Sequence, residues 1–220
     1  MPHASTMNCD PIARWYRPAE YLCFGKSLEH CRLAFLSEAR TARRALLCGG
    51  GDGRFLAALL RANSSVEVEF LDLSRQMIEV AQRRITRMGK EFQARVVFHQ
   101  ADARIFAPLR SGFDLVATHF FLDCLSEKEA AGVIERIAAL AAPRAQWIVS
   151  EFHQPQESPA RLWTGAVIRG LYAAFRATTG LRATRIPPFE SALTNAGFQP
   201  QQRHESLGGL LVAGLWQRSI

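Results

Sequence analysis

The sequence predicts an α/β fold in which helices cover both faces of a parallel sheet. Two observations carry this prediction. Short apolar segments alternate with helical segments from residue 45 to residue 151, and glycine or polar residues follow the ends of the apolar segments. A strand followed by a helix and a further strand joins a parallel sheet, because the helix returns the chain to the starting edge. At 220 residues, such a domain can bury a sizeable core without disulfides or metals.

The elements of the core can be assigned in chain order from their apolar periodicity. A helix is predicted over residues 20–40, where apolar side chains recur at helical spacing at Leu28, Cys31, Phe35 and Leu36. The predicted strands lie at 45–48, 66–71, 96–98, 113–117 and 146–151. The helices between them are predicted at 54–62, from the N-cap Ser74 to Arg87, and from Ser126, which forms a capping box with Glu129, to a point before Pro143.

Beyond Glu151 the alternation of strands and helices stops. The predicted elements are a long helix at 160–178, a short helix at 189–196 ended by Gly197, and two strands within 198–216 joined at Gly208 and Gly209. We therefore predict one domain in four parts: an N-terminal helical cap (1–43), a ligand-binding core (44–151), a helical lid or substrate region (152–197) and a closing β-hairpin (198–220).

Composition and charge narrow the class of protein only in part. The net charge of +7 favours anionic partners in general, nucleic acid among them. The five cysteines form no C-x-x-C pair and no histidine pair has metal-site spacing, so reduced thiols and no metal site are expected. The polar N-terminus lacks the layout of a signal peptide and no apolar run could span a bilayer, which predicts a cytoplasmic protein.

The glycine run Gly49-Gly50-Gly51-Asp52-Gly53 follows the first predicted strand and precedes a helix. Glycines at such a turn let backbone N–H groups approach a ligand closely, and the helix adds the positive end of its dipole. A dinucleotide-binding loop has the spacing G-x-G-x-x-G, whereas Arg54 here follows directly on a G-x-G-x-G pattern. The run indicates a ligand loop, and the alternative is a plain tight turn.

Asp72 ends the second predicted strand, nineteen residues after Gly53. In folds of this kind a carboxylate at that place accepts hydrogen bonds from two ribose hydroxyls. The alternative is a surface or capping residue. Met77 lies on the first turn of the helix that follows Leu73 and Ser74, where it could lie flat on a purine ring or belong to the core.

Two further strand ends indicate the same crevice. Asp102 and Ala103 follow the third strand, where the carboxylate could accept a bond from an exocyclic amine of adenine. His119 ends the fourth strand. Because ligands of open α/β sheets bind at the carboxyl ends of the strands, we expect the glycine run, Asp72, Asp102 and His119 to surround one site.

Residues 45–151 resemble, motif by motif, the core of the class I S-adenosylmethionine (SAM)-dependent methyltransferases. The resemblance implies a Rossmann-like, doubly wound sheet of seven strands with the last strand antiparallel, and a helical lid inserted after the fifth strand. It implies SAM as the cofactor. The SAM-binding residues that it implies are Gly49, Gly50, Gly51, Gly53, Asp72, Leu73, Ser74, Met77, Asp102, Ala103 and His119.

One position departs from the family pattern. The family usually has an acid two residues before the first glycine, where it helps to hold the methionine part of SAM, and this chain has Leu47 there. The absence of the acid could shift its task to Asp52 or His119. It also keeps open a SAM-binding protein of this fold that does not catalyse methyl transfer.

Three short segments outside the core are similar to the ubiquinone and menaquinone C-methyltransferases. They are Glu151-Phe152-His153-Gln154-Pro155, the N-terminal Ile12-Ala13-Arg14-Trp15-Tyr16, and Ala196-Gly197-Phe198 at the start of the closing hairpin. The resemblance implies a relative of that branch and does not fix the same activity.

The region from Ser158 to Phe189 contains five arginines and no acidic residue. Three of the arginines lie near one face of the predicted helix, and Trp163, Val167, Leu171 and Phe175 follow i, i+4 spacing. We expect this helix to form a lid over a lipophilic substrate, with substrate contacts from Trp163, Tyr16 and Tyr21. The alternatives are an aromatic stripe packed on the sheet, and peripheral contact with an anionic membrane.

The predicted function is methyl transfer from SAM to a small, lipophilic or aromatic acceptor, with His119 and His153 as candidate bases. A nucleic-acid (RNA) methyltransferase is an alternative supported only by charge. Where base N-methyltransferases carry an Asn/Asp-Pro-Pro-aromatic segment, this chain has Thr118-His119-Phe120-Phe121, so nucleic acid is not the expected partner. The expected partner is a small molecule, and a homodimer is left open.

Overall fold

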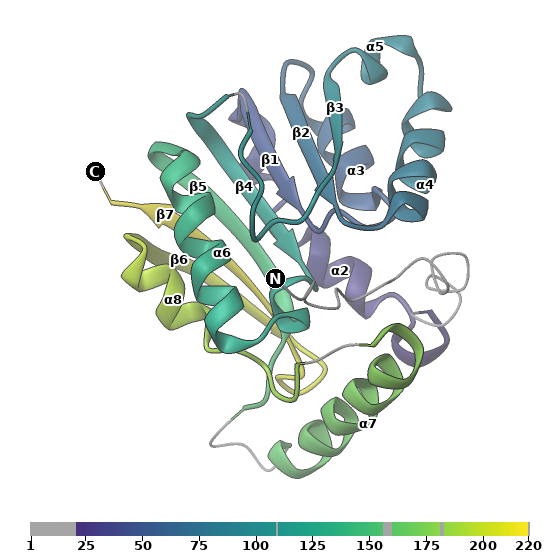
Figure 1. Cartoon of the computed structure of the whole chain (residues 1–220), viewed down its shortest axis with the longest axis vertical. Helices are drawn as coiled ribbons and strands as arrows, with labels where there is room; N and C mark the ends of the chain where they lie inside the picture. The colour runs from purple at the N-terminus through teal and green to yellow at the C-terminus, as the bar shows by residue number, and fades with distance from the viewer. Residues whose placement is uncertain (1–20, 109, 156–159, 181–182, 220) are drawn as a thin grey trace, which may run out of the picture.

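The computed structural model describes residues 21–108, 110–155, 160–180 and 183–219. At its centre lies a seven-stranded sheet with the strand order β3-β2-β1-β4-β5-β7-β6 (Figure 1). Neighbouring strands are parallel from β3 to β5, and β7 runs antiparallel to both β5 and β6. The strands are β1 Arg44–Cys48, β2 Glu67–Asp72, β3 Val96–Gln100, β4 Phe113–His119, β5 Ala141–Phe152, β6 Phe198–Ser206 and β7 Leu211–Arg218. The predicted doubly wound sheet with a reversed last strand is confirmed.

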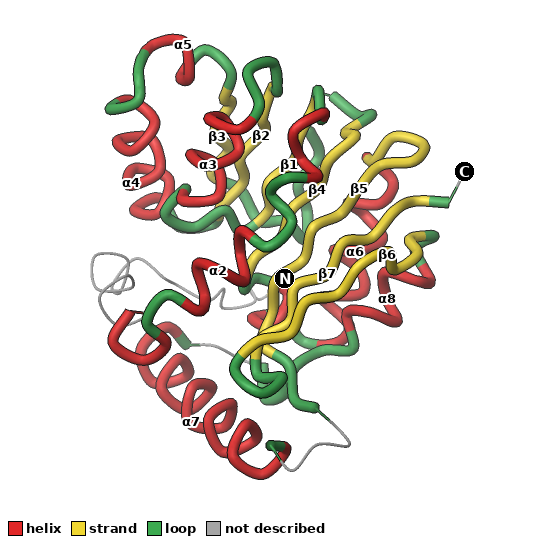
Figure 2. Tube along the Cα trace, turned by 180° about the vertical axis from the view of Figure 1, so that it is seen from behind, coloured by secondary structure: helices red, strands yellow, loops and turns green. Residues whose placement is uncertain are grey.

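Helices cover both faces of this sheet, as Figures 1 and 2 show from opposite sides. One face packs against α2 (Ser27–Leu33), η2 (Glu38–Thr41), α3 (Arg54–Ala62) and α4 (Arg75–Thr86), and the other against α6 (Glu127–Leu140) and α8 (Phe189–Asn195). The short elements α5 (Lys90–Gln93) and η3 (Leu122–Cys124) lie in connections. Figure 1 shows α7 (Arg161–Thr179) beyond the carboxyl ends of the parallel strands.

Alternation along the strands divides the core into two layers. In β1, Ala45 and Leu47 face the layer of α2, α3 and α4, whereas Leu46 and Cys48 face the layer of α6 and α8. All four side chains are at most 3% exposed. Successive side chains of a strand point to opposite faces, so a strand that is buried on both faces is apolar throughout. This is why the run Ala45 to Cys48 identifies β1 in the sequence.

The capping signals in the sequence are confirmed atom by atom. The Ser74 hydroxyl accepts a hydrogen bond from the Met77 N–H and starts α4. Ser126 and Glu129 form the reciprocal capping box of α6, with side chain and backbone bonds in both directions. A hydroxyl at the N-cap satisfies a backbone donor that has no partner within the helix. Local chemistry therefore fixes where both helices begin.

The single helix predicted over residues 20–40 is wrong. Residues 21–24 are helical, Gly25 then adopts a left-handed φ of 56°, and α2 and η2 follow as separate pieces. A left-handed residue ends an α-helix, and glycine adopts that conformation without steric cost. The apolar spacing is nevertheless satisfied, because Leu28, Cys31 and Phe35 are buried.

Two further expectations need correction. Strand β5 begins at Ala141, earlier than predicted, and an irregular register between Phe113 and Leu115 on β4 accommodates Pro143 in the strand. Helix α7 is rotated relative to the predicted apolar stripe: Thr164, Ile168 and Tyr172 are buried, whereas Trp163 is 44% exposed. The arginines Arg161, Arg169 and Arg176 are exposed, as expected.

Several absences can be stated for the part of the chain that the structure describes. None of its helices is long and apolar enough to cross a membrane. It holds no group of three or more side chains suited to bind a metal ion. The cysteines Cys23, Cys31, Cys48 and Cys124 are free thiols.

The buried side chain of Asn63 links η2, α3 and β2, and its substitution tests how much this link stabilises the fold. Its side chain donates to the carbonyls of Ala39 and Ala42 and accepts from the N–H groups of Ser65 and Val66, all within the buried junction of η2, α3 and β2. We expect Asn63→Ala to lower the free energy of unfolding by about 2 to 4 kcal/mol, because buried backbone groups lose their partners. Urea denaturation measures the change. The exposed Asn195→Ala is the control, and an equal effect at both positions would contradict the prediction.

Candidate cofactor and acceptor site

The glycine loop after β1 is built from left-handed residues. Gly49, Gly51 and Gly53 have φ values of 63°, 57° and 76°. A Cβ at Gly49 would lie 2.4 Å from the Phe121 ring, and a Cβ at Gly50 would lie 2.2 Å from the Phe70 ring. Nothing lies within 4 Å of a Cβ placed at Gly51. The loop therefore needs glycine for conformation at Gly49, Gly51 and Gly53, and close packing also excludes a side chain at Gly49 and Gly50. It leaves open space beside Gly51.

Asp72, at the end of β2, ties the glycine loop to the next turn. Its Oδ2 accepts from the Gly51 N–H at 2.8 Å and its Oδ1 accepts from the Ser74 N–H at 2.8 Å. Each carboxylate oxygen has a second lone pair, so these bonds hold the side chain in place without exhausting its capacity to accept. The carboxylate is thus fixed at the edge where the sequence placed a ribose-binding group.

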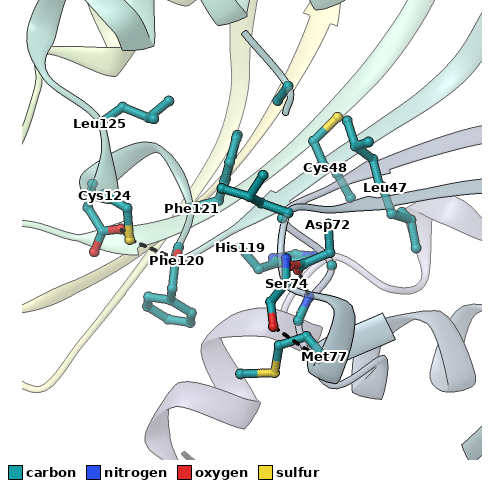
Figure 3. A pocket seen from close by; sticks show the side chains of 18 of the residues that line it. Leu47, Cys48, Asp72, Ser74, Met77, His119, Phe120, Phe121, Cys124 and Leu125 are labelled. Atoms are coloured by element: carbon teal, nitrogen blue, oxygen red, sulfur yellow. Dashed lines mark hydrogen bonds between the residues drawn. The ribbon is translucent and has the colours of Figure 1, made fainter. Parts of the chain in front are cut away.

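These elements surround one cavity of about 220 Å³, part of which is shown in Figure 3. Asp72, Ser74 and Met77 lie together in this view, and Phe120 and Cys124 lie across from them. The predicted cofactor residues that line the cavity are Gly49, Gly50, Gly51, Asp72, Leu73, Ser74, Met77, Asp102, Ala103 and His119. Gly53 does not line it; a Cβ there would lie 2.8 Å from Ala81, so this glycine permits α3 and α4 to pack closely.

Asp102 is engaged by an arginine within its own turn. The Arg104 guanidinium reaches Asp102 Oδ2 at 2.6 Å and Glu129 Oε1 at 2.6 Å. Burial raises the pKa of Asp102, but the hydrogen bonds and charge of Arg104 outweigh it and keep the carboxylate ionised below its ordinary pKa. The Asp102–Arg104–Glu129 group forms a charged rim, and any ligand that Asp102 binds must share it with Arg104.

Leu47 occupies the position at which related methyltransferases usually have an acid, and its surroundings in the folded protein are apolar. Leu47 lines the cavity and is 3% exposed. Asp52, which could have replaced the acid, forms ion pairs with Arg54 at 3.0 Å and Arg84 at 3.1 Å. Its charge is therefore balanced by arginines on α3 and α4, and the structure gives it a role in holding the glycine loop to these helices.

His119 lines the cavity as a neutral imidazole with a defined tautomer. Its Nδ1 lies 3.0 Å from Ser150 Oγ, and the Ser150 hydroxyl donates to the Cys31 carbonyl. Because the single hydroxyl proton goes to that carbonyl, Ser150 must accept from a proton on His119 Nδ1. The lone pair is then on Nε2, which is buried and has no hydrogen-bond partner among the described residues. Burial and the charge of Arg32 depress the pKa of His119 well below its usual value.

Glu151, at the end of β5, organises the loop that follows His119. Its Oε1 accepts from the N–H groups of Phe121 at 3.2 Å and Leu122 at 2.9 Å, and its Oε2 accepts from the Asp123 N–H at 3.3 Å. This carboxyl group is fully buried. Phe120 meanwhile has a left-handed φ of 52°, which is rare outside glycine and is kept only where the surroundings enforce it.

Asp123 is a candidate functional residue that the sequence interpretation did not single out. It lines the cavity, is 7% exposed, and lies against Glu151. Burial raises the pKa of Asp123 to about 6, and burial together with the neighbouring Asp123 raises the pKa of Glu151 well above its usual value. Both shifts have the same origin, because burial and the closeness of the two groups disfavour a negative charge on each carboxyl group. Acids at the ends of both β4 and β5 were the signal that could have identified the pair.

Three other predicted residues are placed outside this site. His153 Nδ1 is 3.0 Å from the Gly209 carbonyl and its Nε2 is 3.4 Å from Arg203, so it holds the β6–β7 hairpin and does not line the cavity. Trp163 lies against Gly208 of the β6–β7 turn and is partly exposed. Tyr21 is 62% exposed, and neither aromatic lines the cavity that the described residues form. Tyr16 lies outside the described residues.

With this geometry established, comparison with known proteins gives a consistent picture. Residues 46–146 match the model of a methyltransferase domain family. Among solved structures, the SAM-dependent methyltransferase SibL is 24% identical with a TM-score of 0.70, over 94% of this chain and 58% of SibL. The N-methyltransferase NodS from Bradyrhizobium japonicum WM9, in complex with S-adenosyl-L-homocysteine (SAH), is 14% identical with a TM-score of 0.60, over 87% of this chain and 83% of NodS. No curated protein matches the sequence significantly.

The fold extends beyond methyltransferases. The cyclase SpnF is 16% identical with a TM-score of 0.64, over 86% of this chain and 82% of SpnF. This chain spans less than two thirds of the SibL chain. At these identities the likeness establishes the fold, and the reaction must be argued from the site.

The match to a methyltransferase domain family makes SAM the cofactor to compare with this cavity. The cavity fits it in three respects: the glycine loop leaves open space beside Gly51, Asp72 presents a fixed carboxylate, and Met77 and Ala103 offer apolar surface. In one respect it does not fit the family pattern, since Leu47 provides no acceptor for an amino group. The residues present therefore suit the nucleoside part of the cofactor better than its amino group.

A glycine pair tests whether close packing at the loop is required. Gly49→Ala and Gly112→Ala both place a side chain at a left-handed φ, but only at Gly49 would the Cβ meet another residue. We expect each variant to lose about 1 kcal/mol from its conformation, and Gly49→Ala to lose a further ~1 to 3 kcal/mol from the collision with Phe121. Urea unfolding and SAH calorimetry measure stability and binding. Equal losses in both variants would show that the Gly49–Phe121 contact is unimportant.

Proposed function

We propose that the protein transfers a methyl group from SAM to a small, largely apolar acceptor. One observation carries the proposal: a single cavity is lined both by the glycine loop and Asp72 and by apolar residues of α7. The first part suits a nucleoside cofactor, and the second part provides a place for a second molecule beside it. A protein that only bound SAM would not require the second part.

The acceptor part of the cavity is mainly apolar. Helix α7 contributes Ile168, Leu171 and Phe175 to its lining, and the loop after β4 and the end of β5 contribute Phe120 and Phe152. The rings of Phe120 and Phe152 have their centroids 5.4 Å apart in a tilted arrangement. Aromatic and aliphatic walls of this kind bind apolar molecules and exclude water. These walls support a lipophilic or aromatic acceptor.

In the proposed reaction, this chain would bind the cofactor, cover the acceptor and orient it. Asp72 and the glycine loop would hold the nucleoside of SAM, which when bound supplies a methyl group on a positively charged sulfur. Helix α7 covers the acceptor pocket and limits water, and the walls orient the acceptor for in-line displacement. His119 presents a neutral nitrogen lone pair and adds no positive charge to the site.

The ubiquinone and menaquinone branch is suggested only by short segments, and in one of them His153 has a local role in the β6–β7 hairpin. Methylation of RNA is supported only by the charge of +7. We therefore propose a small-molecule acceptor and leave the choice of carbon, oxygen or nitrogen to experiment.

Binding of SAH is the direct test of the cofactor site. We expect wild-type protein to bind SAH with a Kd in the micromolar range, and Asp72→Asn to bind at least ~10-fold more weakly, because charge-assisted hydrogen bonds are lost. Calorimetry measures both, and circular dichroism verifies folding. His153→Ala is the matched control, since His153 lies outside the cavity, and it should bind normally. If folded wild-type protein bound no SAH, the cofactor assignment would be refuted.

Turnover is tested by mass spectrometry of a cell extract incubated with the protein and SAM. We expect one or more apolar metabolites to gain the mass of one methylene group, and the gain to disappear with Asp72→Asn. Tight SAH binding without any such product would indicate a binding protein of this fold. Transfer to bulk RNA with salt-sensitive binding would favour the nucleic-acid alternative.

A further inference from the structure

One acidic residue of the cavity lining, Asp123, lies on the loop that follows β4. It belongs to η3, and the apolar residues Phe120, Leu125 and Phe152 line the same cavity. An ionised carboxylate among apolar groups is costly unless a donor reaches it. The Asp123 side chain is reached by the Cys124 thiol, with Sγ 3.3 Å from Oδ1, by the backbone N–H of Cys124 and by the Glu151 carboxyl group.

We propose that Asp123 is the base that receives the proton of the methyl acceptor, and that the acceptor is therefore an apolar molecule carrying a hydroxyl or an amine N–H. This inference rests on the proposed function. The structure assigns the role to Asp123 because this residue lines the cavity and its backbone is held by Glu151 and Tyr172.

The backbone of Asp123 is fixed from two sides. Its N–H donates to Glu151 Oε2, and its carbonyl accepts from the Tyr172 hydroxyl at 2.8 Å. Tyr172 belongs to α7, so the helix that covers the acceptor also holds the residue that meets it. A base must stand within hydrogen-bond reach of the proton that it removes, and rigid support keeps it there.

The ionisable groups around Asp123 define its environment. Glu151 faces it from β5, Tyr172 from α7 and Cys124 from η3, while His119 and Arg32 line the same cavity from β4 and α2. Burial raises the pKa of Asp123 to about 6. At neutral pH the group is thus ionised, yet more basic than an ordinary aspartate, which suits a general base.

His119 is less suited to receive this proton. Burial and the charge of Arg32 hold its pKa well below the usual value, so the protonated imidazole is disfavoured. Its Nδ1–H is committed to Ser150, and only Nε2 could accept. The imidazole can accept a hydrogen bond, but burial and the charge of Arg32 oppose its taking up a proton.

The proposed step is balanced in atoms and electrons. A lone pair on the acceptor oxygen or nitrogen forms the new bond to the methyl carbon, and the electrons of the broken carbon–sulfur bond remain on sulfur, which becomes a neutral thioether. The proton of the acceptor hydroxyl or N–H passes to a carboxylate oxygen of Asp123. No oxidant or reductant is required.

Three naphthalene probes test the inference on SAH-saturated protein: naphthol, naphthylmethylamine and methoxynaphthalene, which lacks a donor. We expect naphthol or the amine to bind ~10- to 100-fold more tightly than methoxynaphthalene, as a hydrogen bond to a charged group would give. Because Asp123 accepts when ionised, the preference should grow as the pH rises through about 6 and level off above it. Calorimetry between acid and neutral pH measures this binding preference. Whether naphthol or naphthylmethylamine binds more tightly shows whether the natural ligand carries a hydroxyl or an amine.

Variants separate Asp123 from general effects on folding. Asp123→Asn should bind SAH normally, lose the preference and its pH dependence, and transfer methyl groups ~10²- to 10⁴-fold more slowly to any probe that wild type methylates. Asp114→Asn is the matched control, because Asp114 is a half-buried aspartate whose carboxylate accepts backbone N–H groups at the start of β4. It should retain the preference. If Asp123→Asn unfolds, Asp123→Ala with added formate replaces it, and formate should restore transfer.

Two results would overturn the inference. One is equal binding of all three probes, or binding of none, to wild-type protein that binds SAH. The other is a folded Asp123→Asn protein that keeps the preference and its pH dependence. Failure of wild-type protein to bind SAH would instead refute the proposed function.

Discussion

The arrangement of the site depends on one interaction, the acceptance of three backbone N–H groups by the buried Glu151 carboxyl group. The loop after β4 leaves the sheet through Phe120 in a left-handed conformation, which an unsupported chain would avoid. Glu151 holds the three residues that follow and so enforces that turn. His119 before the turn and Asp123 after it therefore face one cavity from the same loop.

This loop also connects the two halves of the cavity. The Phe121 ring occupies the space where a Cβ of Gly49 would lie, so the glycine loop and the β4 loop are packed against each other. On its other side the glycine loop is held by Asp72 through the Gly51 N–H. Packing of this kind is rigid, because interiors have few voids to absorb a displacement. A cofactor bound at the glycine loop and an acceptor bound near Asp123 would therefore contact one connected structure.

The sequence predicted the fold more completely than the site, for physical reasons. Periodicity, N-caps and glycines are local signals, and they located β1, α3, α4, α6 and the β6–β7 hairpin to within a few residues. The cofactor edge was also predictable, because parallel strands bring their carboxyl ends together. The acceptor edge was not. The burial of Asp123 against Glu151 and the rotation of α7 that exposes Trp163 arise from contacts between distant residues, which no local spacing encodes.

The loop after β4 lowers the stability of the folded protein, because it contains a strained Phe120 and an ionisable Asp123 that is buried beside Glu151. A carboxyl group whose pKa is raised on folding stabilises the folded state fully below its unfolded pKa and loses that contribution as the pH rises through the folded value. For Asp123 this contribution is lost as the pH rises through about 6, and Glu151, whose pKa is also raised on folding, acts in the same direction. A pair of apolar residues would avoid this cost and the strain at Phe120. Buried charge and backbone strain at one loop, both lining or supporting the cavity, are best explained by a demand for chemistry there.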